Sequence, residues 1–237
     1  MARTASLVIC AAVGVLARVA LGGVAAVATE PTEPRSGGEP PCDMTPTAQV
    51  TAVAAALKEL RGKGYSAQQG HFRVVNSTSF GANPGNPYVM YEFAGTGKLP
   101  AFRLEPRSAV LFVGCTPAGA RYFSWRSYLM TDPKLVFASL GDSLNNLVIN
   151  TKGGGSGSVG GKTAAVVTTG DAATMADIRA ALSTAGLGDA TNIDGYDPKV
   201  IPRPTGLATT FGMLHRAAVW TNDEDKQPYF AQDRECY

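Results

Sequence analysis

Several residue types on which protein sites commonly depend are scarce in this chain. Its 237 residues include only two histidines, His71 and His215, and only four cysteines. No two cysteines have Cys-x-x-Cys spacing, which argues against the common zinc sites and against a thioredoxin-like redox pair. We therefore expect neither a metal nor a cofactor.

The aspartates of the C-terminal half also lack the spacing of a metal site. They do not alternate in the way that the oxygen ligands of a calcium loop do. We expect these carboxylates to lie in solvated helix caps and turns: Asp171, Asp177, Asp189, Asp194 and Asp197.

An excess of charge is missing as well. The formal net charge is +2, and Arg3 and Arg18 near the N-terminus account for it. The remainder of the chain is neutral and offers no electrostatic footprint for nucleic acid or for an anionic membrane. Neither is expected as a partner, and the sequence leaves the ligand and the oligomeric state open.

Long apolar runs occur only at the N-terminus. Ala5–Ala17 and Val19–Ala28 are apolar, are separated by Arg18, and end in the small-x-small pattern that signal peptidase accepts. Residues 1–28 are therefore predicted to be a signal peptide that is cleaved before Thr29, which makes the protein secreted or extracytoplasmic. The alternative is an uncleaved membrane anchor. After residue 29 no run is long enough to span a bilayer, so we expect no membrane contact after cleavage.

Three cysteines remain once the predicted leader is removed: Cys42, Cys115 and Cys236. In an oxidising compartment two of them should pair and the third should stay free or bond another chain. The sequence does not say which two. Cys236 is the penultimate residue, so a second explanation is that the natural chain continues beyond Tyr237 and is truncated here.

The part of the chain after the leader divides into a linker and one domain. Residues 29–46 are rich in proline and glycine and have no apolar period, which is typical of an extended linker. Residues 47–237 are predicted to form a single globular domain. An amphipathic helix over residues 47–61 opens it, because apolar residues recur there at helical spacing and Gly62 and Gly64 follow.

Strands dominate the middle of the domain. Aromatic and β-branched residues predict them at 71–75, 88–93, 102–105, 109–113, 121–130 and 135–139. Residues 102–105 and 109–113 are expected to form an antiparallel hairpin about the turn at Pro106. In the segment 121–130, Phe123 and Trp125 are expected to face the core, because the period is two.

The C-terminal part combines both kinds of element. A buried strand at 164–169, a helix that Asp171 caps, and a strand near residues 192–194 predict a βαβ unit. Residues 211–220 are apolar at most positions and are expected to be a central strand or a short buried helix. The predicted fold is α/β or α+β, a mixed sheet-rich single domain with an N-terminal amphipathic helix and a C-terminal βαβ unit.

The most suggestive motif is Gly-Asp-Ser-Leu at residues 141–144, which follows a short apolar strand. It resembles the first block of the GDSL-type esterases and lipases, the SGNH hydrolases. The resemblance implies that Ser143 is the nucleophile of an acyl transfer. The Asp-x-x-His block of that family is absent, because neither histidine has an aspartate three residues before it. Of the two, His215 is the more plausible base. A serine hydrolase that uses Ser143 and His215 is therefore one functional hypothesis.

The same block has a structural interpretation. Residues 141–143 would form a turn in which Asp142 or Ser143 caps a short helix beginning at Leu144. Polar residues after a buried strand often line a cleft, so Asp142, Asn145 and Asn146 are candidate cleft-lining residues.

At a longer scale, three segments resemble an uncharacterised family of predicted secreted proteins: 122–129, 136–146 and the Phe-x-Met-Leu-His-Arg segment at 211–216. The resemblance implies no activity. Its members continue beyond the last segment, which again favours a truncated chain. Asn76 opens an Asn-Ser-Thr glycosylation sequon on a predicted loop. The favoured hypothesis is a secreted binding or structural module.

Overall fold

The computed structural model describes ten parts of the chain, and every structural statement below concerns these residues. The described parts are 5–11, 42–75, 88–93, 102–131, 138–141, 143–155, 160–196, 210–226, 229 and 235–236, with residue 142 left out between the fifth and the sixth. Three of the predicted features lie outside them: Asn76, Asp142 and Asp197.

Two α-helices form one layer of the fold. Helix α1 spans Pro46–Gly62, and the Thr45 hydroxyl accepts the Ala48 amide at 3.2 Å. Helix α2 spans Ala172–Thr184, and the Asp171 carboxylate accepts the Thr174 amide at 2.7 Å. Each capping side chain satisfies an amide that has no partner inside the helix. Both predicted helices are confirmed.

The strands join in one sheet of eleven. Along its main path the order is β6-β5-β10-β3-β2-β1-β4-β8-β9, while β7 pairs with β5 and β11 pairs with β2. The bounds are β1 Ala5–Ala11, β2 Tyr65–Val75, β3 Tyr88–Phe93, β4 Ala109–Cys115, β5 Ala120–Thr131, β6 Ala138–Ser139, β7 Leu144–Asn145, β8 Thr163–Thr168, β9 Thr191–Ile193, β10 Thr210–Trp220 and β11 Glu235–Cys236. A short 3-10 helix, Asp223–Asp225, follows β10.

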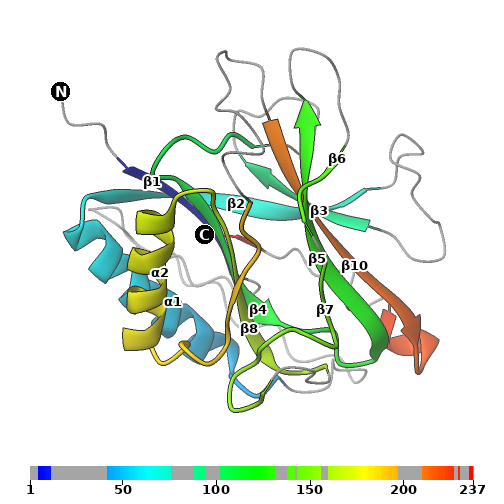
Figure 1. Cartoon of the computed structure of the whole chain (residues 1–237). Coiled ribbons are helices and arrows are strands. Elements are labelled where there is room, and N and C mark those ends of the chain that lie inside the picture. Colours follow the sequence, from blue (N-terminus) through cyan, green and yellow to red (C-terminus); the bar gives the residue numbers. More distant parts are fainter. Residues whose placement is uncertain are drawn as a thin grey trace, which may run out of the picture.

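The sheet bends so that two of its parts face each other. In Figure 1 both helices cover one side of β1, β4 and β8, and β5 and β10 run across the other side. The helices pack on the sheet through a core that includes Leu60, Leu111 and Ile178. A second core fills the space between β4 and β8 on one side and β3, β5 and β10 on the other. Trp125, Phe112 and Tyr91 are its largest side chains, and all three are fully buried. The result is a mixed α/β single domain.

The predicted βαβ unit is present. Strand β8 leads through α2 into β9, and β9 pairs with β8 in parallel, with Ala165 opposite Thr191. Two neighbouring parallel strands need such a crossover, because the chain must return to the starting end of the sheet before the second strand begins.

Two local predictions are wrong. Residues 102–105 and β4 form no hairpin, because β4 pairs with β1 and β8 and Phe102 forms a bridge with Phe211. No helix begins at Leu144 either, since Leu144–Asn145 form β7 against β5. In both places the partner comes from a distant part of the chain, which local sequence does not reveal.

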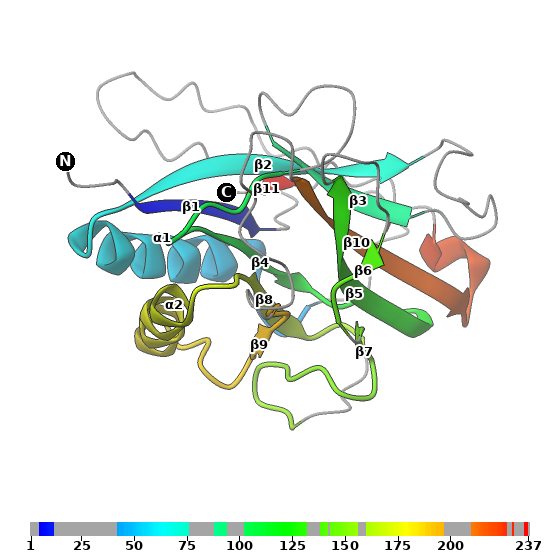
Figure 2. The ribbon, with the colours of Figure 1, turned by 45° about the horizontal axis from the view of Figure 1, so that its top comes forward.

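The N-terminal segment takes an unexpected place. Strand β1 lies inside the predicted leader, and Figure 2 shows it between β2 and β4. It pairs with both neighbours in parallel. The signal peptide remains a prediction, and the strand adds a role that the apolar pattern alone did not suggest.

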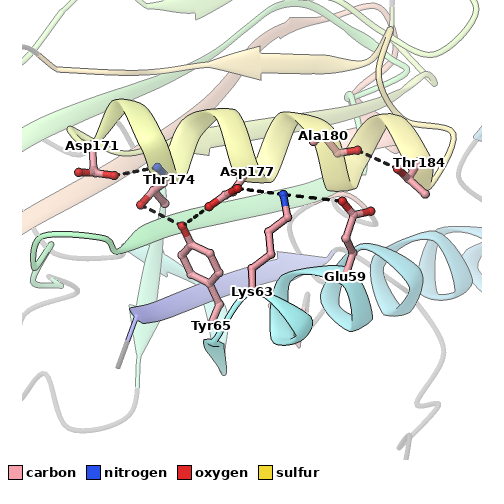
Figure 3. Close-up of polar contacts among 8 residues, drawn as sticks. All are labelled: Glu59, Lys63, Tyr65, Asp171, Thr174, Asp177, Ala180 and Thr184. Atoms are coloured by element: carbon pink, nitrogen blue, oxygen red, sulfur yellow. Dashed lines mark hydrogen bonds and ion pairs between the residues drawn. The ribbon is translucent and has the colours of Figure 1, made fainter. Parts of the chain in front are cut away.

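Polar contacts hold the two helices together at their exposed edge (Figure 3). The Lys63 ammonium lies 2.9 Å from Asp177, whose other oxygen accepts the Tyr65 hydroxyl at 2.9 Å. These two hydrogen bonds lower the pKa of Asp177, with the Lys63 bond as the larger cause. The group is exposed, so its contribution to stability is small. We assign these contacts the structural role of orienting α2 against α1.

Neither helix in the described part of the chain is long and apolar enough to cross a membrane.

Candidate functional site

The predicted nucleophile Ser143 lies beside a cation. Its hydroxyl oxygen is 3.4 Å from the Nη2 atom of Arg126 on β5. A guanidinium keeps its proton at any ordinary pH and therefore cannot act as a general base. The contact orients the hydroxyl without activating it.

The predicted base His215 is part of the core. Its side chain is 2% exposed, and its ring stacks on Trp125 with 4.2 Å between centroids. The Nε2 atom and the Tyr229 hydroxyl lie within hydrogen-bonding distance. These contacts are those of a packed structural histidine.

The fold does not bring Ser143 and His215 together. His215 on β10 lies opposite Trp125 on β5, and Leu144 on β7 lies opposite Trp125 from the other side. Two strand spacings therefore separate β10 from β7, about 10 Å. Neighbouring residues alternate between faces, so Arg126 and the hydroxyl that it contacts lie on the face opposite to His215.

The candidate cleft-lining asparagines have local roles. The Asn145 side chain accepts the Leu147 amide at 2.8 Å, and the Asn146 side chain donates to the Arg121 carbonyl at 3.2 Å. Such bonds are typical of asparagine in turns. They fix the turn that follows β7.

A different arrangement lies on the face of β3, β10 and β5 that points away from the second core. We call it the arginine face. Across the strands, Arg216 lies between Tyr88 and Ser124, and in the next row Leu214 lies between Met90 and Arg126. The tyrosines and arginines are half-buried. The members of this face are Tyr88, Met90, Tyr122, Ser124, Arg126, Tyr128, Met130, Leu214 and Arg216.

The two arginines of this face are close to each other. Arg126 lies opposite Leu214, and Arg216 is two residues further along β10. Diagonal neighbours of this kind have Cα atoms about 7–8 Å apart. Arginine side chains are long enough to bring both guanidinium groups to one ligand.

Within the described residues, neither guanidinium has a carboxylate partner. The two ion pairs found there both involve Lys63. The Nε atoms of Arg126 and Arg216 are buried and donate no hydrogen bond to the protein. Arg216 lies over the rings of Tyr88 and Tyr122, 5.6 and 5.9 Å from their centroids. Positive charge is thus held on a half-buried face without neutralisation.

The described residues contain no group of three or more histidine, cysteine or acidic side chains that could hold a metal. Comparisons with known proteins add no candidate. No protein family, curated protein or solved structure matches this chain. The function is therefore inferred from the geometry of the chain itself. The resemblance of residues 141–144 to the GDSL-type hydrolases stays a prediction.

A buried carboxyl joins the two layers of the sheet. Asp194 follows β9 and is only 7% exposed, so its predicted place in a solvated turn is wrong. It accepts the Ser127 hydroxyl at 2.5 Å, and the Thr168 hydroxyl lies 3.4 Å from Ser127. Burial raises the pKa of Asp194 to about 6, against the lowering effects of the Ser127 bonds and the Arg126 charge. This carboxyl is protonated in mildly acidic solution.

Asp171 and Asp189 agree with the expectation of caps and turns, but Asp177 lies inside α2, where its carboxylate pairs with Lys63. Asp171 caps α2, and Asp189 accepts the Gly153 amide at 2.8 Å in an exposed turn.

The cysteine prediction is resolved in part. Cys42 and Cys115 form a disulfide, with 6.0 Å between Cα atoms. The side chain of Gln49 is buried against it, and its Nε2 atom lies 3.1 and 3.0 Å from the two sulfurs. Cys236 lies in β11 and pairs through its backbone with Gly70 of β2, and its side chain lies outside the described part. The disulfide ties the segment before α1 to the end of β4.

Sequence reasoning found Ser143 but missed its neighbour. Arg126 and Arg216 lie 90 residues apart in segments that looked like ordinary strands. The available signal was the alternation in 121–130, which places Tyr122, Arg126 and Tyr128 on the face opposite to Trp125.

Proposed function

We propose that this protein is an extracytoplasmic binding module, and that its arginine face holds an anionic group between Arg126 and Arg216. The observation that carries the proposal is the pair of half-buried guanidinium groups, which have no carboxylate partner among the described side chains. Removing a charge from water is costly unless it is paired. A ligand anion would supply the missing partner.

The donor geometry favours an oxyanion. An arginine offers several N–H groups in one plane, which suits the oxygens of a carboxylate, phosphate or sulfate. Arg126 and Arg216 are each half-buried, and the Ser143 hydroxyl lies 3.4 Å from the Nη2 atom of Arg126. One anion with two charged groups, such as pyrophosphate, could span both arginines.

The tyrosines would hold the rest of the ligand. The rings of Tyr88 and Tyr122 flank Arg216, and Tyr128 lies on the same face beyond Arg126. Tyrosine and arginine are enriched in recognition surfaces, because they give large contact areas at low entropic cost. The favoured ligand is therefore an anionic molecule with an apolar or ring-shaped part.

The disulfide supports a location outside the cytoplasm. Bonds such as Cys42–Cys115 persist in oxidising compartments and are rare in the cytosol. This agrees with the predicted signal peptide, which remains to be tested by determining the N-terminus of the exported protein.

The proposal is tested by NMR titration of the purified protein with inorganic pyrophosphate at low ionic strength. The expected result is that the Nε–H signals of Arg126 and Arg216 shift together as binding saturates. The exposed Arg179 on α2 is an internal control whose signal should stay in place. Uniform small shifts of all arginines would show non-specific charge screening and would refute the proposal.

A further inference from the structure

We infer that the gap between β2 and β4 is a strand-acceptor site, which takes an extended, uncharged, apolar segment of a partner chain whenever residues 5–11 do not fill it. The inference rests on backbone pairing and is independent of the arginine face. In the structure the chain's own β1 occupies the site and defines what fits there.

The occupant is held on both sides. Residues 5–9 lie opposite 65–69 of β2, and residues 7–11 lie opposite 109–113 of β4, both in parallel. On the main path of the sheet, β1 is the strand that links the β2-β3-β10-β5 part to the β4-β8-β9 part. It lies between the two in both orientations of the molecule (Figures 1 and 2).

An empty site would leave one edge of β4 and residues 65–69 of β2 without a sheet partner. The pairing of β2 with β3 begins only at Gly70, so β1 is the sheet partner of residues 65–69. Strand β4 would present a free edge along Ala109–Val113, all of which are at most 1% exposed in the filled state. Long apolar edges of this kind recruit another strand.

The neighbours limit the kind of occupant. Residues 5–11 contain no charged side chain and no proline or glycine. A proline would remove a donor from one of the ladders, and a charge would have to be buried between two paired strands. The site therefore selects a segment of about seven apolar residues in parallel orientation.

The site has a direct consequence for the predicted leader. Residues 5–11 lie within the segment 1–28, so cleavage before Thr29 would remove the occupant. An exported protein that lacks this segment would have to receive a strand from a partner. A protein that keeps residues 5–11 would fill the site with its own strand.

The experiment opens the site in the full-length chain with Val8→Pro, which removes a backbone donor from one ladder of β1 and forces the backbone away from strand geometry in its middle. A fluorescent peptide with the sequence of residues 4–12, carrying Cys10→Ser, is then added. The expected result is one bound peptide per Val8→Pro chain, and at least tenfold weaker binding to the wild-type chain, whose site is filled. The control peptide carries Leu7→Pro and Ile9→Pro and should not bind.

Hydrogen exchange provides the second readout. The amides of Ala109–Val113 that face β1 should be protected in the wild type, exposed in Val8→Pro, and protected again when the peptide binds, while those that face β8 should stay protected throughout. If Val8→Pro does not fold alone, refolding it with the peptide should restore the native spectrum. Failure of the peptide to bind or to restore the fold would overturn the inference. So would a folded Val8→Pro monomer in which the β4 amides that face β1 stay protected, or a stable dimer that the peptide does not dissociate.

Discussion

The Nη2 atom of Arg126 lies 3.4 Å from the hydroxyl oxygen of Ser143. This contact connects the most suggestive sequence motif to a face of the sheet that the sequence did not single out. The group beside the Ser143 hydroxyl is thus a guanidinium and not the imidazole base that the hydrolase hypothesis expects. We therefore propose that the motif at residues 141–144 borders the binding face and is not a nucleophile elbow.

Ser143 should not react as a hydrolase nucleophile. Among the described side chains no imidazole lies beside it, because His215 on β10 packs against Trp125, on the face of β5 opposite to Arg126. Incubation of the purified protein with a fluorescent fluorophosphonate should give no more label than Ser143→Ala gives. Labelling of the wild type that Ser143→Ala and His215→Ala both abolish would restore the hydrolase hypothesis.

The disulfide should be a major support of the fold. Cys42 and Cys115 are 73 residues apart, and closing a loop of this length restricts the unfolded chain by about 4 kcal/mol in the entropic model. Native strain and residual structure reduce that value, so Cys42→Ser combined with Cys115→Ser should lower the free energy of unfolding by about 2–4 kcal/mol.

Chemical denaturation of the variant and of the wild type measures this difference. Reducing agent should destabilise the wild type by a similar amount and leave the double variant unchanged. An unfolding free energy that neither treatment alters would contradict the assigned role.

Asp194 should make stability depend on pH. Its pKa is raised to about 6 in the folded protein, above about 3.9 in an unfolded chain. The folded state then binds the proton more tightly, so the stabilisation is fully present below pH 4 and is lost as the pH rises through 6. The size of the effect is about 2–3 kcal/mol at most, because one pKa unit corresponds to about 1.4 kcal/mol.

Urea denaturation at pH 4.5 and pH 7.5 tests this for the wild type and for Asp194→Asn. The variant should have a weaker pH dependence, because its amide does not titrate. Asp189→Asn, in an exposed turn, is the matched control and should behave as the wild type. Equal pH dependence in all three proteins would refute the buried titration.

Aromatic packing between the two parts of the sheet should dominate the second core. Trp125 is fully buried, and its ring lies 5.4 Å from that of Phe112 and 5.7 Å from that of Phe123. Phe112→Ala should cost about 3–5 kcal/mol of unfolding free energy, as large-to-small changes in aromatic cores do. Val219→Ala, at an exposed position, should cost far less. Equal losses in thermal denaturation would contradict the described core.

Local patterns accounted for the elements that local interactions stabilise. Both helices were predictable, because Thr45, Pro46 and Asp171 mark their starts and apolar residues recur at helical spacing. The alternation in β5 correctly placed Phe123 and Trp125 in the core. The βαβ unit followed from the order of its elements.

Long-range pairing was beyond the reach of those patterns. The position of β1 between β2 and β4 depends on partners about 60 and 100 residues away, and an apolar run looks the same in a leader and in a buried strand. Asp194 looked like a turn residue because its burial comes from β5, which is far away in the sequence. The arginine face arises only when β10 pairs with β5.

The most direct test of the proposed function is calorimetric titration with pyrophosphate at low ionic strength. The wild type is compared with Arg126→Gln combined with Arg216→Gln, and Arg179→Gln on α2 serves as a control for the loss of an arginine outside the arginine face. Circular dichroism verifies that each variant is folded. The account predicts that the control binds as the wild type does, that the double variant loses at least tenfold in affinity, and that added salt weakens wild-type binding. Undiminished binding by the folded double variant would contradict it.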